Sequence, residues 1–296
     1  MKTAQHFFYQ NDTLTVDGVP LDKLAMQYGT PLYVYSKAAL TEHFRQYADV
    51  CKQFETDDIH SLVCYSVKSN SNLAILNILG REGAGFDIVS GGELLRVIAA
   101  GCDSRKVIFS GVGKTASEIR LALEHDILCF NVESFAELRR INRIAAEMGK
   151  KARVSFRVNP NVDPKTHPYI STGLKENKFG IPYEEALAGY EEAARMPHIE
   201  VTGIDCHIGS QLLDDAPLLE ALDKLIDLFD QLAQKGIELK HIDIGGGIGI
   251  TYDNEIPVAI SDYLTRIFGK ITAWKNAKYP GQSISMMFEP GRSISG

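Results

Sequence analysis

Lys68 directly follows an apolar run, residues 61–67, that is typical of a buried parallel strand. The polar residues 69–72 behind it mark a turn. Because α/β proteins gather their reactive groups at the carboxyl ends of parallel strands, Lys68 stands where chemistry is expected. Apolar surroundings disfavour a charged amine, so we expect a lowered pKa and a nucleophile that forms Schiff bases with carbonyl compounds. The alternative is an ordinary solvated lysine.

Further polar residues stand at or just beyond the ends of other apolar runs: Asp87, Glu93, Arg157, His207 and Glu289. If the strands are parallel, these ends face one another, and the side chains share one site. Each residue also has a plainer interpretation. Asp87 and Glu93 could cap a helix that begins near Gly91, and His207 could be a hydrogen-bonded core histidine.

Two glycine-containing segments could bind a phosphate. Residues 245–247 read GGG, which is either a tight turn or a nest of backbone amides open to an anion. The run GGGIGI lacks the third spaced glycine of the dinucleotide fingerprint. Residues 289–292, EPGR, place a carboxylate, a glycine amide and a guanidinium within four positions, or else form a turn with Pro290 in second place.

Together these groups match what pyridoxal phosphate requires. Lys68 would bond to the aldehyde, and Glu289 would keep the pyridine nitrogen protonated so that the ring withdraws electrons. His207 would lie flat against the ring. The phosphate would be held by a hydroxyl and by backbone amides, from Ser210, Gly246, Gly247, Gly291 and Arg292. A site for a phosphorylated sugar would explain the glycines but not the lysine, histidine and glutamate beside them.

Strand-like and helix-like patterns alternate regularly along the chain. Apolar runs occur at 61–67, 86–89, 106–110, 128–132, 152–158, 201–208, 241–245 and 283–288, and helical patterns lie between them. Such alternation predicts βαβ units and a parallel sheet. Eight strands close a (β/α)8 barrel of the TIM type, which we favour over an open doubly wound sheet.

Two parts of the chain fall outside this repeat. Before the barrel we expect a strand and turn at 13–20, a helix at 21–28 and a short strand at 32–35. The connection 159–182 is too long for a simple βα loop and is rich in Pro, Gly, Asn and Lys, which favours a lid or a binding loop.

Composition excludes several classes of function. With 45% apolar residues among 296, the chain can bury a large core, and its net charge of −7 without a basic cluster argues against a nucleic-acid partner. We see neither a signal-peptide pattern nor an apolar run of membrane-spanning length. The five scattered cysteines lack zinc-ligand spacing and indicate free thiols, so we expect a cytoplasmic protein without a metal site.

The motifs YSVKSN, FDIVSGGEL, HIGSQ, DIGGGIGI and EPGRS, in this order, resemble those of fold-type III pyridoxal phosphate-dependent decarboxylases, which have an alanine-racemase-like barrel. Residues 159–181 are similar to the matching stretch of the diaminopimelate decarboxylase family. The resemblance covers nearly the whole chain. It implies decarboxylation of meso-2,6-diaminopimelate to L-lysine and CO2, the last step of lysine biosynthesis.

The resemblance also implies residue roles. Lys68 would carry the cofactor and later transfer a proton, and His207 would stack on the ring. Arg292 would bind a substrate carboxylate with its two parallel N–H groups. The remaining cofactor-binding residues implied are Asp87, Glu93, Arg157, Ser210, Gly246, Gly247, Glu289, Pro290, Gly291 and Arg292.

Members of this family continue beyond EPGR into a β-rich second domain that completes the partner subunit's active site in a homodimer. We therefore expect residues 1–36 to pair with such a domain, residues 37–296 to form the cofactor-binding barrel, and this sequence to be a piece of a longer protein. The alternatives are a decarboxylase of ornithine, arginine or carboxynorspermidine, or a barrel that binds pyridoxal phosphate without catalysis.

Overall fold

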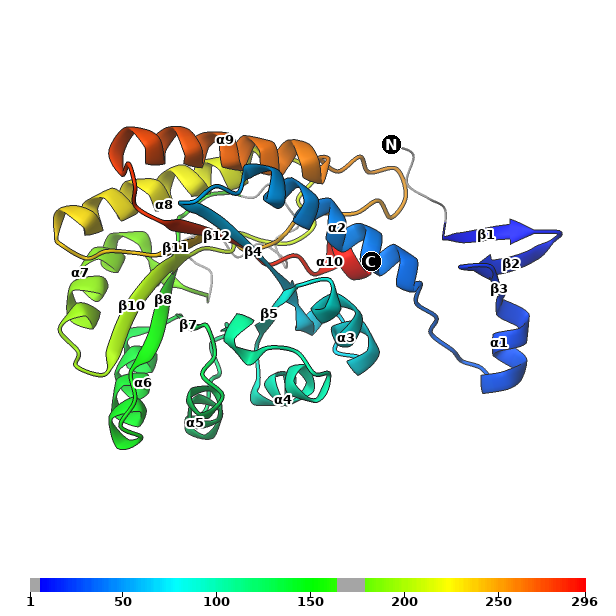
Figure 1. Ribbon diagram of the computed structural model, residues 1–296, viewed down its shortest axis with the longest axis horizontal. Coiled ribbons are helices and arrows are strands. Elements are labelled where there is room, and N and C mark those ends of the chain that lie inside the picture. The colour runs from blue at the N-terminus through cyan, green and yellow to red at the C-terminus, as the bar shows by residue number, and fades with distance from the viewer. Residues whose placement is uncertain (1–5, 164–178) are drawn as a thin grey trace.

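Eight parallel strands form a closed barrel in the computed structural model, which describes residues 6–163 and 179–296 (Figure 1). Each strand pairs in parallel with the next, and the pairing of β8 with β10 and of β12 with β4 closes the ring. The barrel strands are β4 (Ile59–Ser66), β5 (Gly85–Ile88), β6 (Val107–Phe109), β7 (Cys129–Val132), β8 (Ala152–Asn159), β10 (Ile199–Asp205), β11 (His241–Asp243) and β12 (Ile284–Phe288).

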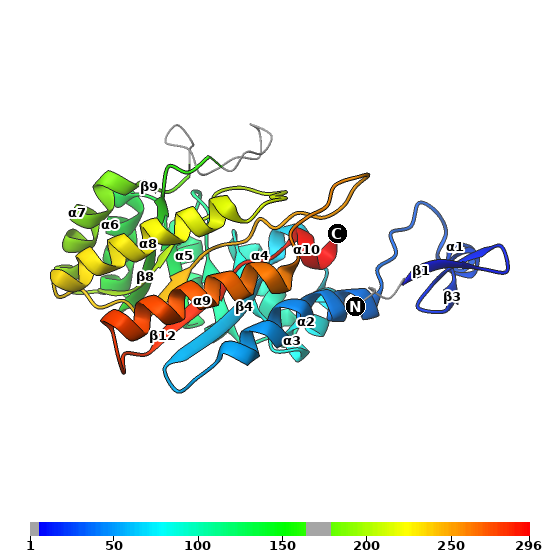
Figure 2. The ribbon, with the colours of Figure 1, turned by 90° about the horizontal axis from the view of Figure 1, so that it is seen from above.

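Helices follow the strands and surround the barrel (Figures 1 and 2). Several begin at a Ser, Thr or Asn whose side chain accepts a backbone N–H of the first turn, which lets a helix start a few residues after its strand. They are α2 (Lys37–Phe54), α3 (Leu73–Arg81), α4 (Gly91–Ala99), α5 (Ala116–Glu124), α6 (Phe135–Glu147), α7 (Tyr183–Ala194), α8 (Ala216–Gln234), α9 (Ile260–Lys278) and α10 (Arg292–Ser295).

Alternation along the strands divides the buried side chains into two sets. The larger set packs between the strands and the helices and includes Phe86, Phe109 and Phe130. A separate small cluster of Cys64, Ile108, Cys129 and Met287 occupies the alternate positions, which point into the barrel. The interior is thus a packed core, and the chemistry is confined to the strand ends.

The first residues form a small unit beside the barrel (Figures 1 and 2). It consists of β1 (Phe7–Gln10), β2 (Thr13–Val16) and β3 (Val19–Pro20), which pair antiparallel, and α1 (Leu21–Tyr28). Ser36 caps α2 and donates its hydroxyl hydrogen to Asp17 over 2.7 Å, which joins this unit to the barrel.

The predicted strand at 32–35 is wrong. These residues are irregular, and Tyr33 is 86% exposed. A β-favouring run becomes a strand only when another backbone pairs with it, and no such partner lies beside 32–35 among the described residues.

The other boundaries agree with the sequence pattern except at two strand ends. The predicted strands 201–208 and 241–245 end earlier than expected, at Asp205 and Asp243. The apolar residues that follow them belong to the turns at the barrel mouth. The expected lid or binding loop lies mostly outside the described residues, which resume at Phe179 and form the two-residue strand β9 (Ile181–Pro182). No helix within 6–163 and 179–296 has the length and apolarity to cross a membrane.

Candidate active site

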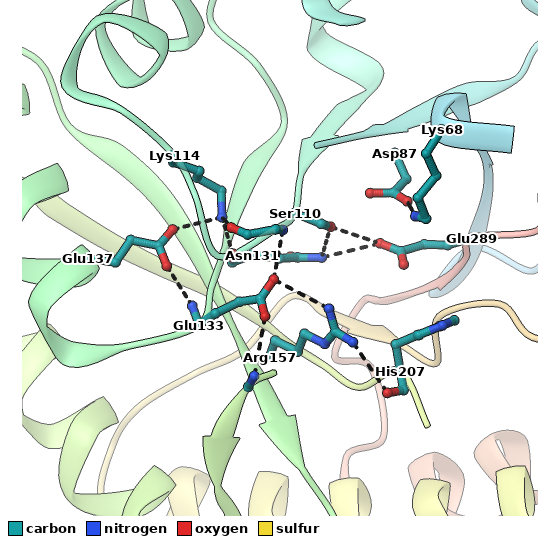
Figure 3. A network of polar contacts seen from close by, with 12 residues as sticks. Lys68, Asp87, Ser110, Lys114, Asn131, Glu133, Glu137, Arg157, His207 and Glu289 are labelled. Carbon is teal, nitrogen blue, oxygen red and sulfur yellow. Dashed lines mark hydrogen bonds and ion pairs between the residues drawn. The ribbon is translucent and has the colours of Figure 1, made fainter. Parts of the chain in front are cut away.

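Lys68 lies at the barrel mouth, in the short 3-10 turn η1 (Val67–Ser69) that follows β4. Its ammonium group donates a hydrogen bond to Asp87 on the neighbouring strand (Figure 3). It also donates, over 3.4 Å, to the hydroxyl of Ser66. Ser66 donates in turn to Asp87 over 3.0 Å. Ser66 and Asp87 are register partners in β4 and β5, so the parallel pairing itself brings the lysine to its carboxylate.

The expected fall in the pKa of Lys68 is wrong for this arrangement. Burial of the amine lowers the pKa, but the negative charges of Asp87 and Glu289 outweigh it, and the pKa lies above the ordinary lysine value. The side chain is 47% exposed, and burial is still the largest single influence on this pKa, so it takes both carboxylates together to reverse it. Lys68 is therefore an ammonium ion at neutral pH.

Glu289 follows β12 and is buried on the other side of the mouth from β7. Its Oε1 atom accepts hydrogen bonds from the amide of Asn131 over 3.3 Å and from the hydroxyl of Ser110 over 3.5 Å (Figure 3). Burial, followed by the charges of Asp243 and Asp87, raises the pKa of Glu289 well above its usual range. The protonated form of this acid is therefore more favoured than in a solvated glutamate.

Two further buried acids, Asp205 and Asp243, lie close to Glu289, although sequence reasoning assigned neither a role. They face each other in the register of β10 and β11, and oxygen atoms of all three acids lie within 4.8 Å of one another. Burial raises the pKa of Asp243 to about 7 and that of Asp205 well above its ordinary value. Both acids stand inside the predicted apolar runs 201–208 and 241–245, and a charged residue within such a run was the available signal.

His207 is held as a neutral ring. The backbone N–H of Gly246 donates to Nδ1 over 3.3 Å, so the ring proton is on Nε2. Loss of contact with water, followed by the positive charges of Arg157 and Lys68, lowers the pKa of His207 well below its ordinary value. A neutral imidazole is suited to stacking on an electron-poor ring.

Arg157, on β8, belongs to a network of buried charges that the sequence analysis did not foresee (Figure 3). Its guanidinium donates to Glu133 over 3.3 Å and to the carbonyl of His207 over 3.5 Å. Behind Glu133, Glu137 accepts a 2.7 Å hydrogen bond from the fully buried ammonium of Lys114.

The glycines at 245–247 allow three backbone segments to meet. A Cβ on Gly246 would lie 2.1 Å from the carbonyl oxygen of Glu289, and one on Gly247 would lie 2.4 Å from that of Gly209. Gly245 has a φ of +68° and donates its N–H to Asp243 over 2.8 Å. The crowding explains why glycine is needed here, and the phosphate-binding role of these amides remains a prediction.

The segment 289–291 packs directly behind the lysine turn. The N–H of Ser66 donates to the carbonyl of Pro290 over 3.0 Å, and the Ser66 hydroxyl shares its one hydrogen between Asp87 and the carbonyl of Glu289, which lies 2.9 Å away. Gly291 begins α10, and a Cβ there would lie 3.0 Å from the Cβ of Ser66. The Lys68 and Glu289 turns are therefore fixed relative to each other.

Ser210 and Arg292, two of the predicted site residues, contact each other at the barrel mouth. Nε of Arg292 donates to the Ser210 hydroxyl over 3.2 Å, and its Nη1 atom donates to the hydroxyl of Tyr252. The guanidinium carbon lies 5.7 Å from the centre of the Tyr252 ring. Tyr252 was not singled out from the sequence.

Glu93 has a more local role. Its Oε2 atom accepts the N–H of Val89 over 2.7 Å, while Ser90 caps α4 by accepting the N–H of Glu93. Burial raises the pKa of Glu93, to which the nearby charge of Asp87 also contributes. Glu93 thus shapes the turn that carries Asp87, and Ser90 is the helix cap.

These residues fit pyridoxal phosphate. An amine, a buried acid with a raised pKa and a neutral imidazole meet at one mouth, where Asp87 Oδ1 and Asp243 Oδ2 are buried without a hydrogen-bond partner. A cleft of about 1120 Å³ lies elsewhere, between α2 and the start of α9, and among the described residues no predicted site residue lines it. Its charged walls hold no comparable set of reactive groups, so we place the active site at the mouth.

Comparison with known proteins gives the same assignment. Residues 39–296 match the family model described as "Pyridoxal-dependent decarboxylase, pyridoxal binding domain". The chain is 53% identical to diaminopimelate decarboxylase of Pseudomonas aeruginosa over 97% of its own length and 66% of that protein's. It thus spans about two thirds of the length of the curated relatives that it matches.

Solved structures of diaminopimelate decarboxylases have the same barrel fold. Diaminopimelate decarboxylase from M. jannaschii, in complex with L-lysine, superimposes with a TM-score of 0.90 at 38% identity, covering 98% of this chain and 67% of that one. Diaminopimelate decarboxylase from Helicobacter pylori, also in complex with L-lysine, superimposes with a TM-score of 0.85 at 43% identity. The match covers 93% of this chain and 66% of that one. The predicted barrel, cofactor and resemblance are confirmed. This chain belongs to the family of pyridoxal-dependent decarboxylases and carries its pyridoxal-binding barrel.

Proposed function

We propose that the protein containing this chain decarboxylates meso-2,6-diaminopimelate to L-lysine and CO2. The observation that carries the proposal is the 53% identity with a diaminopimelate decarboxylase over 97% of this chain. The Lys68–Asp87 pair and the buried Glu289 support it, because a barrel that had lost catalysis would have no need to keep them together at the mouth.

Bound pyridoxal phosphate supplies an aldehyde for the amino groups and a ring that takes up the negative charge left when CO2 departs. Lys68 would hold it covalently through Nζ. Glu289, a buried acid whose pKa is raised, would keep the ring nitrogen protonated, and neutral His207 would cover one face. Ser210 and the amides of Gly246, Gly247 and Gly291 would hold the phosphate.

Lys68 is also the proton donor that this chain offers to the product. Asp87 and Glu289 keep its amine charged, and Asp87 and Ser66 hold Nζ by hydrogen bonds. An ammonium held in this way can deliver a proton to the carbon that has lost its carboxylate.

Arg292 would bind a carboxylate of the substrate. In the structure Ser210 and Tyr252 hold its guanidinium by hydrogen bonds. The Arg292 side chain therefore loses fewer conformations when a carboxylate binds. Arginine suits this role because its parallel N–H groups match the two oxygens of a carboxylate.

We further propose that residues 1–36 belong to a second, β-rich domain, and that the whole protein is a cytoplasmic homodimer. In support, the unit around β1 and α1 exposes large apolar side chains, including Tyr9 at 74% and Met26 at 78%. The five cysteines are free thiols, as is usual in a reducing compartment.

The test is release of CO2 from meso-diaminopimelate by the full-length protein with added pyridoxal phosphate. Formation of L-lysine is expected, with ornithine, arginine and carboxynorspermidine turned over far more slowly. Preference for one of those substrates would assign a different basic amino-acid decarboxylase. Cofactor binding without release of CO2 from any of them would assign a non-catalytic barrel.

A further inference from the structure

Glu133 contacts three separate segments at the barrel mouth, and none of the roles described above accounts for these contacts. It follows β7 directly, and its side chain is only 1% exposed. Its Oε1 atom accepts the N–H of Gly111 over 2.7 Å and the guanidinium of Arg157 over 3.3 Å. Its Oε2 atom accepts the N–H of Gly180 over 3.2 Å.

These contacts join segments that are distant in sequence. Gly111 lies in the turn after β6, Arg157 near the end of β8, and Gly180 just before β9. Gly180 has a φ of +78°, and a Cβ there would lie 3.0 Å from the carbonyl oxygen of Arg157. The returning chain is therefore packed tightly on the backbone that carries the guanidinium.

Glu133 is itself supported from behind. Its N–H donates to Glu137 over 2.9 Å, and Glu137 pairs with Lys114. Lys114 also donates to the carbonyls of Gly111 and Asn131, each over 2.8 Å. A buried charge held on several sides is costly to move, so this support keeps the Glu133 carboxylate in one place.

Arg157 has other anionic groups within electrostatic reach, namely Asp205, Glu289 and Asp87. Without Glu133, its positive charge would be drawn toward those acids. A guanidinium beside Glu289 would favour the carboxylate form of that residue, and the contact with the His207 carbonyl would be lost. The placement of Arg157 thus affects Glu289 and His207, the two residues expected to contact the cofactor ring.

We propose that Glu133 is a positioning residue for this site, because its carboxylate fixes the Arg157 side chain beside the backbone of His207. It acts through Arg157 and touches neither substrate nor cofactor. The effect on the cofactor rests on the proposed function, whereas the attachment of Gly111 and Gly180 to the carboxylate does not.

The test compares Glu133→Gln with Asp230→Asn in the full-length protein. Glutamine cannot accept on both sides, so Glu133→Gln should speed hydrogen exchange at the Gly180 amide and weaken binding of pyridoxal phosphate on the order of tenfold. Asp230 lies near the end of α8 and accepts hydrogen bonds from Trp274 and Tyr279, so its replacement removes a carboxylate with no contact to Glu133 or Arg157. Asp230→Asn should lower the melting temperature while the cofactor's dissociation constant stays close to that of the unchanged protein.

A double variant tests the path through Arg157. Arg157→Lys should weaken binding, and adding Glu133→Gln should weaken it little further, because both changes remove the same arrangement. Independent losses that add would overturn the proposal, as would unchanged affinity and unchanged Gly180 exchange in Glu133→Gln.

If Glu133→Gln does not fold, Glu133→Asp takes its place, since it keeps the charge and shortens the reach by one methylene. Like Glu133→Gln, it should speed hydrogen exchange at the Gly180 amide and weaken binding of pyridoxal phosphate. If the unchanged protein fails to bind pyridoxal phosphate, the proposed function fails, and exchange at Gly180 still decides whether Glu133 holds the returning chain. Rapid exchange there in the unchanged protein would overturn the proposal.

Discussion

Lys68 donates a hydrogen bond to Asp87, a fully buried carboxylate on the next strand whose second oxygen accepts none. A lysine in apolar surroundings would be neutral, but this one is held as an ammonium. Lys68 must lose a proton before it can attack an aldehyde, and Asp87 controls how easily that happens.

Asp87→Asn should therefore shift the attachment of pyridoxal phosphate to lower pH. Loss of one charged hydrogen bond is expected to lower the pKa of Lys68 by about one unit, so the neutral amine appears about one pH unit earlier. The measurement is the amount of borohydride-reducible adduct as a function of pH. An onset at the same pH as in the unchanged protein would remove Asp87 from this role.

Asp243 makes the cofactor-free protein less stable as pH rises. Its pKa is raised from 3.8 to about 7, so between about pH 4 and 7 the folded state binds more protons than the unfolded state, and stability falls as pH increases. The full effect is at most about 4 kcal/mol at 1.36 kcal/mol per unit.

Asp243→Asn removes this contribution and keeps an oxygen for the N–H of Gly245. Melting temperatures across pH 4 to 8 should show the variant gaining stability relative to the unchanged protein as pH rises. The difference isolates Asp243 from His241, whose pKa is lowered by burial to about 4 and whose effect on stability runs the other way. A difference that does not vary with pH would contradict the account.

Glu289→Gln should leave the cofactor bound but slow turnover about 100-fold, since the ring nitrogen would lose its acid. Asn131 and Ser110 can still donate to the glutamine oxygen, so the fold should be retained. Turnover and cofactor content are measured together in the full-length protein. A variant with full cofactor content and unchanged turnover would exclude Glu289 from the reaction.

Gly246→Ala should destabilise the protein by about 2 kcal/mol and weaken cofactor binding, because the new methyl group would overlap the carbonyl of Glu289. Gly113→Ala is the matched control, since nothing lies within 4 Å of a Cβ there. Thermal melts of the two variants provide the comparison. Equal melting temperatures would show that the glycine segment is not crowded as described.

Much of this arrangement could be predicted from sequence because each barrel strand is short, apolar and followed by a polar turn. The pattern placed Lys68, Asp87, His207 and Glu289 at strand ends, and the structure brings them together. The prediction for residues 32–35 failed because strand formation depends on a partner that local pattern does not reveal.

The electrostatics could not be predicted in the same way. The pKa of Lys68 depends on whether its amine meets apolar groups or Asp87, and only the register of β4 and β5 decides this. Asp243 and Glu133 were missed because single acids beside strands usually face water. Their burial follows from closure of the barrel.

The central claim is that Lys68 is the residue that bonds to pyridoxal phosphate. The most direct measurement is to incubate the full-length protein with the cofactor, reduce with borohydride and map the modified peptide. We predict one modified lysine, Lys68, and no adduct in Lys68→Ala, while the control Lys106→Ala, at a half-buried lysine before β6, is labelled as before. An adduct at another lysine, or an unchanged adduct in Lys68→Ala, would contradict the account.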